Sequence, residues 1–560
     1  MTETMRKSLW LALLLAAGTA LTPALAALPP GTGASGAFLI GRHALRLGDT
    51  ATAADAMQSA LQQDPDEAQL MPRAFQLLIS EGRYEAAWAV ADRAGARLRA
   101  DGTTAIALAV RDAAAGRLAE AERRLQRIAE GGLAGTVRHM LLAWVQAGLG
   151  RSAEARATLE LLKGDQNFGL LHFVHLGLMS ELLNDVDAAA EAFRQAIDGV
   201  EQLPYRLGLA AGAFYERQGR AGDAEALYER LRRENPDSQL TQALLARRAK
   251  GEPPPRLVTK AADGMAEVMV DLASALRRER GSDLSLLYAR LALALQPGME
   301  IARLLVAEAY DDQQQYAAAL ALYQSLTDSP SYGYAAQLGA VEALVGLKRS
   351  DEAAALLEQM ALARPDLPDP LVRLGDLMRT GKRWLDAAAA YDRALARIAS
   401  PAQRHWSLFY SRGIAHERSK QWAKAEADFH RALELEADQP FVLNYLGYSW
   451  ADQGIRLDEA AEMIERAVAR RPRDGYIVDS LGWVLYRASR YEDAVRQLER
   501  AVELRPNDPT INDHLGDAYW KVGRHREALF QWRRVLVLEH DDTDDLLARA
   551  EAKIRGEGRP

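Results

Sequence analysis

Three short patterns in the sequence contain residue types that carry out chemistry in other proteins. The glycines of residues 31–36 have the spacing of a dinucleotide-binding loop, but no strand pattern precedes them. His172 and His175 stand three residues apart and could face one metal ion, yet no third ligand is spaced nearby. The aspartates of residues 541–545 lack the glycine turn and the terminal glutamate of a calcium loop. We therefore expect no cofactor and no metal site.

The sequence also offers no catalytic motif. It has no cysteine, which excludes thiolate nucleophiles, disulfides and lipidation of a processed cysteine. It has no nucleophile elbow, zincin helix or phosphate loop, and its abundant carboxylates single out no acid–base pair. The 69 basic and 77 acidic residues provide no basic face of the kind that nucleic acids need. We expect a protein that is not an enzyme and does not bind nucleic acid.

The N-terminus has the pattern of a signal peptide over residues 1–26. Arg6 and Lys7 precede an apolar run from Leu9 to Ala17, and a small-x-small cleavage pattern ends at Ala26. An uncleaved anchor is the alternative, although Pro23 argues against it, and retention in the cytoplasm is a third possibility. We expect cleavage after Ala26, a periplasmic location with association to the outer membrane through partners, and no later transmembrane segment.

A 34-residue period organises the rest of the chain. Glycine recurs with this step, and alanine recurs five residues after each glycine, giving the pairs Gly48 and Ala53, Gly82 and Ala87, Gly116 and Ala121, and Gly150 and Ala155. Each period holds two helix-length segments with apolar residues at helical spacing, separated by a turn. Small residues such as Gly482 and Ala494 would let paired helices touch, so Gly482→Leu should loosen the stack. Prolines such as Pro506 would end the second helix.

These residues resemble the tetratricopeptide repeat. Leu481, Gly482, Leu485, Ala494, Ala501 and Pro506 match its pattern, as do Leu515, Gly516, Tyr519 and Ala528. The resemblance implies an all-α fold, a right-handed solenoid of about fourteen helical hairpins. The units would start at Ala34, Ala68, Gly102, Thr136, Leu170, Tyr205, Ala266, Glu300, Tyr334, Pro368, Trp406, Pro440, Gly475 and Pro509.

Interruptions of the period predict the domain organisation. A linker at 27–33 leads to an N-terminal solenoid over 34–250, which includes an extra helix from Gln239 to Lys250. Residues 251–255 cannot be helical, and a proline-rich linker over 251–265 would separate this solenoid from a C-terminal solenoid over 266–542. Residues 543–560 would form a polar capping helix and tail. Smaller insertions fall at 402–405 and within 453–457.

The family resemblance places the first helix of each unit on the concave side, where binding usually happens. The C-terminal third is rich in aromatic residues, with 17 of the chain's 38 between Trp406 and Trp532. Core packing explains residues such as Phe429, Tyr519 and Trp532, whereas Trp483, Tyr486 and Trp520 could serve either packing or recognition. The predicted peptide-binding groove consists of Tyr410, Asn444, Tyr448, Asp479, Trp483, Tyr486, Asp513, Asp517 and Trp520.

The charges on this face favour some partners over others. The carboxylate clamp of some family members is not reproduced, and three aspartates would repel a carboxylate, so a basic or apolar peptide segment is expected. Residues 443–448, 479–487 and 514–516 with Trp520 are similar to envelope repeat proteins of the LbcA type. That similarity implies an adaptor that brings substrates to a carboxyl-terminal-processing protease, although this chain lacks the cysteine that anchors those lipoproteins. The alternative is a structural or assembly factor for a pilus, secretion or polysaccharide-export machine.

Overall fold

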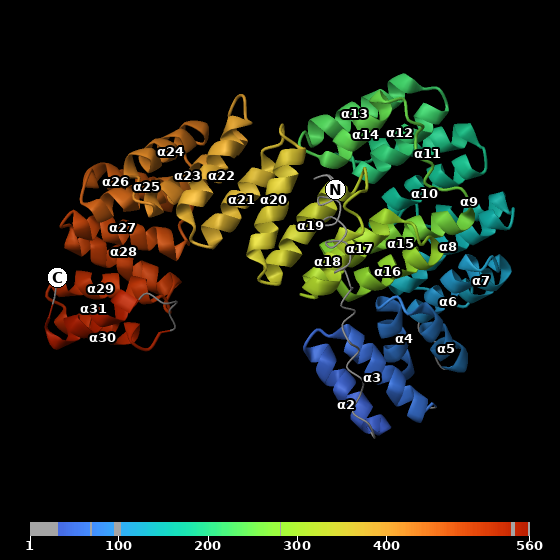
Figure 1. Ribbon diagram of the computed structural model, residues 1–560, viewed down its shortest axis with the longest axis horizontal. Helices are drawn as coiled ribbons and strands as arrows, with labels where there is room; N and C mark the ends of the chain where they lie inside the picture. Colours follow the sequence, from blue (N-terminus) through green and yellow to red (C-terminus); the bar gives the residue numbers. More distant parts are fainter. Residues whose placement is uncertain are drawn as a thin grey trace, which may run out of the picture. The chain divides into compact units, whose positions relative to one another are not determined.

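The computed structural model describes residues 32–65, 67, 70–94, 102–279, 282–538, 544–557 and 560 (Figure 1). These ranges contain α-helices α2 to α31 and one short 3-10 helix, η1, and they contain no strand. The predicted all-α fold is confirmed. None of the described helices combines the length and the apolar character that a membrane span requires. The predicted signal peptide, residues 1–26, lies outside the described residues.

The chain divides into two compact units, and the boundary in the sequence lies between Ala353 and Ala354. The first contains α2 (Ala34–Arg46), α3 (Thr50–Gln63), α4 (Leu70–Ser80), α5 (Tyr84–Ala94), α6 (Gly102–Ala114), α7 (Leu118–Leu125), α8 (Gly132–Gly148), α9 (Ser152–Glu160), α10 (Gly169–Leu182), α11 (Val186–Asp198), α12 (Tyr205–Arg217), α13 (Ala221–Glu234), α14 (Gln239–Ala249), α15 (Ala261–Arg278), α16 (Ser282–Leu295), α17 (Glu300–Asp312), α18 (Tyr316–Gln324) and α19 (Gly333–Gly346).

Helix α20 (Ser350–Ala363) contains the boundary between the units. The second unit continues with α21 (Asp369–Thr380), α22 (Trp384–Ala396), η1 (Gln403–His405), α23 (Trp406–Arg418), α24 (Trp422–Leu435), α25 (Pro440–Gln453), α26 (Leu457–Arg470), α27 (Gly475–Arg487), α28 (Tyr491–Leu504), α29 (Pro509–Lys521), α30 (His525–Val535) and α31 (Asp544–Arg555). Successive helices pair into hairpins, and the first helices begin within five residues of the predicted unit starts.

The periodic glycines form the turns inside the hairpins. Gly82 and Gly150 have φ of +72° and +80°, a left-handed backbone that glycine adopts without the steric cost of a side chain. The turn position lies five residues before a fully buried alanine, as at Ala87 and Ala155, which lets the second helix pack closely on the first. Turn and contact therefore repeat together, which explains the period of the sequence.

Close helix contacts also occur where the sequence predicted them. A Cβ atom on Gly482 would lie 2.4 Å from Cγ of Leu498, and one on Gly516 would lie 2.4 Å from Nε1 of Trp532. The insertion near 402–405 is absorbed by η1, and the longer turn after Gln453 by two left-handed residues, Gly454 and Arg456.

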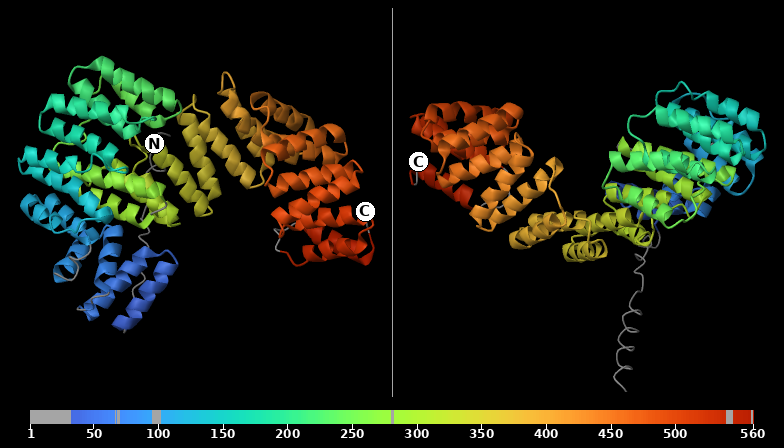
Figure 2. Two further views of the ribbon diagram at one scale, coloured as in Figure 1. Left: turned by 180° about the vertical axis from the view of Figure 1, so that it is seen from behind. Right: turned by 90° about the horizontal axis from the view of Figure 1, so that it is seen from above.

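The division of the chain differs from the one that the proline-rich stretch suggested. Residues 251–260 are not helical, but residues 261–265 of the predicted linker already belong to α15. The hairpin α15–α16 packs against α4, α6, α8 and α10 of the same unit. Figures 1 and 2 show this hairpin inside the arc of the N-terminal helices. The segment itself is held by Arg217, whose Nη1 donates to the carbonyl of Pro255. After the prolines, the chain therefore packs against earlier repeats of the same unit. The boundary between the two compact units lies later, between Ala353 and Ala354.

Candidate functional site

The first helices form the inner side of the second unit. Successive first helices, such as α25 with α27 and α27 with α29, contact one another, whereas successive second helices such as α26 and α28 do so far less. Helices that approach each other lie on the side of smaller radius. Nearly all of α29 from Ile511 to Tyr519 is buried, because this helix packs on its partner α30, on α27 and on α28.

An aromatic cluster lies at one end of this inner side. The ring of Tyr410 is 6.1 Å from that of Trp406, 6.1 Å from that of Phe429 and 5.9 Å from that of Tyr445. Phe429 is fully buried, as expected for a packing residue, and Tyr410 is half-buried. Burial raises the pKa of Tyr410 to about 12, so its hydroxyl remains a neutral hydrogen-bonding group at physiological pH.

A second cluster, on α27 and α29, joins aromatic rings to an ion pair. His514 Nδ1 lies 3.0 and 3.1 Å from the two carboxylate oxygens of Asp479. The imidazole stacks on Trp483 with 4.2 Å between ring centroids, and Trp483 stacks in turn on Tyr486 at 5.1 Å. Asp479 is therefore compensated inside the protein and is 7% exposed. The sequence pattern predicts that Asp479 repels a carboxylate, whereas in the structure His514 of the next inner helix matches its charge, a contact that no local pattern indicates.

The other two predicted carboxylates are also neutralised internally. Lys553 of α31 places its Nζ 2.8 Å from Oδ1 of Asp513 and 2.6 Å from Oδ1 of Asp517. Asp517 accepts a further hydrogen bond of 3.1 Å from Nε1 of Trp532, and all four side chains are buried. The expectation of an acidic groove at Asp513 and Asp517 therefore fails, since the capping helix supplies its own cation to both carboxylates.

Trp520, the last predicted residue, is half-buried at the end of the same face. Its ring stacks on His525 at 4.0 Å and lies 5.6 Å from the ring of Trp532. Tyr448 on α25 is also half-buried, and burial with nearby Asp452 and Asp479 raises its pKa to about 12. These two residues remain accessible in part, in contrast to the aspartates.

Asn444 Oδ1 and Trp483 Nε1 on this face are buried and have no hydrogen-bond partner among the described residues. Such atoms are uncommon in folded proteins because leaving one unpaired costs about 1 to 3 kcal/mol. One is an acceptor and the other a donor, on the neighbouring inner helices α25 and α27. A bound chain that supplies complementary groups after small side-chain movements would satisfy both.

Sequence reasoning missed three residues that shape this face, namely His514, Lys553 and Tyr445. Lys553 lies in the predicted cap, and its spacing from the aspartates follows no repeat, so no periodic pattern could have indicated the contact. His514 follows Asp513 directly and is buried on α29. On this face the aspartates are therefore paired within the protein, and the side chains that remain partly accessible are aromatic.

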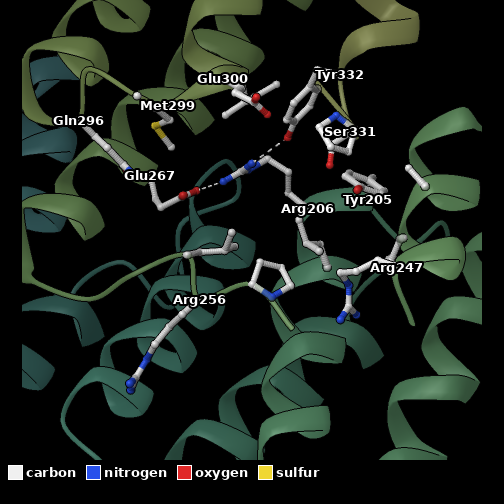
Figure 3. Close-up of a pocket in the computed structure, with 18 of the residues that line it drawn as sticks. Tyr205, Arg206, Arg247, Arg256, Glu267, Gln296, Met299, Glu300, Ser331 and Tyr332 are labelled. Atoms are coloured by element: carbon white, nitrogen blue, oxygen red, sulfur yellow. Dashed lines mark hydrogen bonds and ion pairs between the residues drawn. The ribbon is translucent and has the colours of Figure 1, made fainter. Parts of the chain in front are cut away.

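The first unit contains a separate pocket of about 380 Å³ beside the non-helical segment that ends near Lys260 (Figure 3). The guanidinium of Arg206 points between Glu267, with which it forms an ion pair, and the hydroxyl of Tyr332, at 3.4 Å. Glu300 at its edge accepts a 2.8 Å hydrogen bond from Ser329 Oγ. These polar groups join α12, α15 and the segment before α19, so they hold the hairpin α15–α16 in place.

The two histidines considered as metal ligands have structural contacts. His172 Nδ1 lies 2.8 Å from the carbonyl of Leu159. Nε1 of Trp144 donates to His175 Nδ1 at 3.2 Å, and His175 Nε2 lies 3.2 Å from Asp271 of α15. Within the described ranges no group of three or more His, Cys, Asp or Glu side chains could hold a metal ion. His175 links α10 to the hairpin α15–α16.

The family model of the TPR repeat matches residues 482–523, the stretch from α27 to the start of α30 that contains Trp483, His514 and Trp520. This stretch of the second unit therefore matches the tetratricopeptide repeat. Proteins of this repeat type bind protein or peptide partners, and the fold is typically a non-catalytic interaction scaffold.

Known proteins resemble this chain in sequence or in fold. TPR repeat-containing protein PA4667 of Pseudomonas aeruginosa is 31% identical over 155 residues, which are 28% of this chain and 26% of that protein. The chain thus spans about a quarter of that relative. Among solved structures, the APC/C hetero-tetramer Cut9-Hcn1 aligns over 92% of this chain and 96% of its own, with 15% identity and a TM-score of 0.35. YrrB, described as a TPR protein with an unusual peptide-binding site, aligns over 35% and 95%, with 17% identity and a TM-score of 0.28.

Proposed function

We propose that the protein is a non-catalytic scaffold whose second unit binds an apolar segment of a partner protein on its inner side. The binding surface consists of Tyr410, Asn444, Tyr448, Trp483, Tyr486 and Trp520, and we call it the aromatic face. Its members lie on the first helices α23, α25, α27 and α29. The observation that carries the proposal is this row of half-buried rings together with two unpaired polar atoms.

Rings of this kind provide binding energy because they present large apolar area with few rotatable bonds. Trp and Tyr are accordingly enriched among the residues that dominate protein interfaces. Trp483 and Tyr486 are already held in a stack with His514, so little side-chain entropy is lost when a partner covers them. This preorganisation favours recognition at the aromatic face.

The charge arrangement makes an apolar segment a better partner than a basic one. Asp479 contacts His514, and Asp513 and Asp517 share Lys553, so no unpaired carboxylate awaits a partner cation on these helices. A basic segment would have to displace Lys553 from a buried site, whereas an apolar segment only covers half-buried rings. Polar backbone groups of that segment would pair with Asn444 and Trp483.

The cellular role that we propose is an adaptor in the bacterial envelope, which presents captured proteins to a carboxyl-terminal-processing protease. The export pattern of residues 1–26 and the similarity of residues 443–448 and 479–487 to envelope adaptors support this role. An adaptor needs one surface for its substrate and a second for its enzyme. Mass spectrometry of the mature N-terminus tests the location, and cleavage after Ala26 is the expected result.

Site-specific photo-crosslinking in cells tests binding at the aromatic face. A photoreactive phenylalanine replaces Tyr448 in one variant and Phe530 in a control, because Phe530 lies on α30 and is 60% exposed. Crosslinks should form at position 448 and be rare at position 530. A synthetic peptide of the crosslinked segment should then lose about tenfold or more in affinity with Trp483→Ala and Trp520→Ala, while the helical content stays unchanged. Equal crosslinking at both positions would refute the proposed face.

A further inference from the structure

Three exposed arginines at the N-terminal end of the first unit form no ion pair with any described residue. Arg42 and Arg46 lie on α2, and Arg73 lies on α4. All three are exposed, and within the described part of the chain none of them has an ion-pair partner. Other arginines of the unit are paired, as Arg83 is with Asp55. Unpaired cations so close together repel one another, and this repulsion is relieved when an anion binds.

The sequence of these two helices accentuates the positive charge. Neither α2 nor α4 contains an acidic residue, in a chain whose net charge is −8. The three arginines outnumber the two nearby carboxylates, Glu81 and Asp283, which accept hydrogen bonds from the hydroxyl of Thr50 and, at 3.0 Å, from Gln313 Nε2. The end of the unit at α2, the first helix in Figure 1, is therefore a local basic surface on an acidic protein.

The arginines border two adjoining hollows that share Leu45 and Arg73. One, of about 450 Å³, is lined by Phe38, Arg42, Leu45, Arg46 and Arg73. The other, of about 500 Å³, continues toward α16 and is lined in part by Leu77, Leu284 and Leu287. Leu284 is 41% exposed and therefore offers apolar area to a bound chain. The two hollows together form a groove that is basic at the α2 end and lined at the α16 end by leucines, with Asp283 and Gln313 beside them.

The groove is the part of the inner side of the first unit that the chain does not fill itself. The hairpin α15–α16 covers the inner helices α6, α8 and α10, and α16 also reaches α4. Gly264 of α15 packs against Trp144 so closely that a Cβ atom there would lie 2.3 Å from the indole. The hairpin therefore occupies the surface of α6, α8 and α10, whereas the hollows beside α2 and α4 remain open.

We propose that this groove binds a partner protein through a segment that combines side-chain carboxylates with apolar residues. Guanidinium groups form paired, directional hydrogen bonds with carboxylates, which makes arginine well suited to acidic segments. The apolar end near Leu284 would take leucine-like side chains and fix the direction of the bound chain. This site is distinct from the aromatic face and does not depend on it. It would give a scaffold its second protein-binding surface.

Binding of labelled synthetic peptides to the full-length mature protein tests the proposal. One peptide alternates glutamates and leucines, a second carries lysines in place of the glutamates, and a third carries serines in place of the leucines. The first should bind most tightly, and its affinity should fall as the ionic strength rises. Binding of the lysine peptide with equal affinity would overturn the proposal, as would no loss on replacing the leucines.

Charge reversal locates the site. The variant Arg42→Glu, Arg46→Glu and Arg73→Glu should weaken binding of the acidic peptide by about tenfold or more. The matched control changes Arg123, Arg127 and Arg232 to Glu, because these arginines are exposed and lie outside the groove. It carries the same change in net charge and should bind like the unaltered protein, as should Trp483→Ala. Circular dichroism verifies that each variant is folded. Equal loss in both triple variants would refute a local site.

Anionic vesicles and a short DNA duplex serve as competing probes. If the groove recognised negative charge alone, either probe would displace the acidic peptide as well as unlabelled peptide does, and the proposal of a protein partner would be overturned. If the apolar end contributes, Leu284→Ser should weaken binding of the leucine-containing peptide and leave binding of its serine counterpart unchanged. Loss of the aromatic face by mutation changes none of these outcomes.

Discussion

Lys553 of α31 places its ammonium group 2.6 Å from Oδ1 of Asp517 on α29. Both side chains are buried, and Asp513 shares the same cation at 2.8 Å. Burial and the neighbouring Asp513 raise the pKa of Asp517, and Lys553 opposes this shift. The final helix is thus attached by a buried charge cluster in addition to the apolar contacts of Leu546 and Ala550.

Removing this cation should loosen the last repeat. Lys553→Met keeps most of the side-chain length but leaves two buried carboxylates without a counter-charge. A buried pair broken in this way costs about 3 to 5 kcal/mol. We expect much faster amide hydrogen exchange in α29 and α31, measured by mass spectrometry. Arg555→Met is the control, because Arg555 is on the same helix but is exposed, and its loss should change stability by less than about 0.5 kcal/mol.

Neutralising the partners should restore the lost stability. Asp513→Asn and Asp517→Asn, added to Lys553→Met, remove the repulsion between the carboxylates and keep their hydrogen-bonding shape. We expect protection of α29 to recover in large part. If Lys553→Met alone exchanges at the rate of the Arg555→Met control, the cluster does not hold the helix.

The repeat was predictable because two physical requirements recur in the sequence at the same step. The turn needs a left-handed residue, supplied at Gly82 and Gly150, and the helix contact needs a small one, supplied at Ala87 and Ala155. Both requirements are local, so they are visible without knowledge of the fold. Contacts between distant segments have no such signal.

The predictions for the aspartates of the site failed because the state of these residues depends on such distant contacts. Trp483 and Tyr486 are half-buried on an inner helix, where the period placed them, whereas the state of Asp479 depends on His514 and that of Asp517 on Lys553. Likewise, the proline-rich stretch correctly indicated a break in helix, but only the packing of α15 on α8 reveals where the chain goes next. Whether the predicted residues bind a partner stays a prediction.

The contact between Trp144 and Gly264 should be sensitive to a single methyl group. Trp144 is fully buried, so the indole cannot move aside for Gly264→Ala. We expect a loss of about 3 kcal/mol, the upper end for overpacking, and faster proteolysis within residues 251–260. Urea unfolding monitored by circular dichroism measures the first effect. At Gly222, where an added Cβ would touch nothing within 4 Å, Gly222→Ala should be neutral or slightly stabilising.

Turns that lack the periodic glycine test whether the left-handed backbone of the turn position accounts for the repeated glycines. Ser489 occupies the turn position with φ of 61°, a left-handed backbone that costs a residue with a side chain about 1 kcal/mol. Ser489→Gly should stabilise the second unit by about 0.5 to 1 kcal/mol in urea unfolding, after the entropy cost of glycine. Gly150→Ala should have the opposite sign, with φ of +80° and no neighbouring atom within 4 Å of the added methyl group. Changes of the same sign would contradict this account.

His514 should make the stability of the second unit depend on pH. Burial lowers the pKa of His514, but the combined effect of Asp479, Asp513 and Asp517 is to raise it by more than burial lowers it. The pKa in the folded protein is therefore above its ordinary value of about 6.5. The folded state therefore binds the proton more tightly than the unfolded chain does. The resulting stability is complete below about pH 6.5 and is lost as the pH rises through the raised pKa. Titrations with urea at several pH values should show this decline.

The difference between the unaltered protein and His514→Gln isolates this contribution from the other histidines. The difference in unfolding free energy should be largest at about pH 6 and should shrink as the pH rises through the raised pKa. Asp479→Asn removes the main partner of the imidazolium and should flatten the same dependence, whereas Asp438→Asn, at an exposed ion pair with Arg466, should not. A difference that grows toward alkaline pH would mean that His514 is neutral in the folded protein and stacks on Trp483 as an uncharged ring.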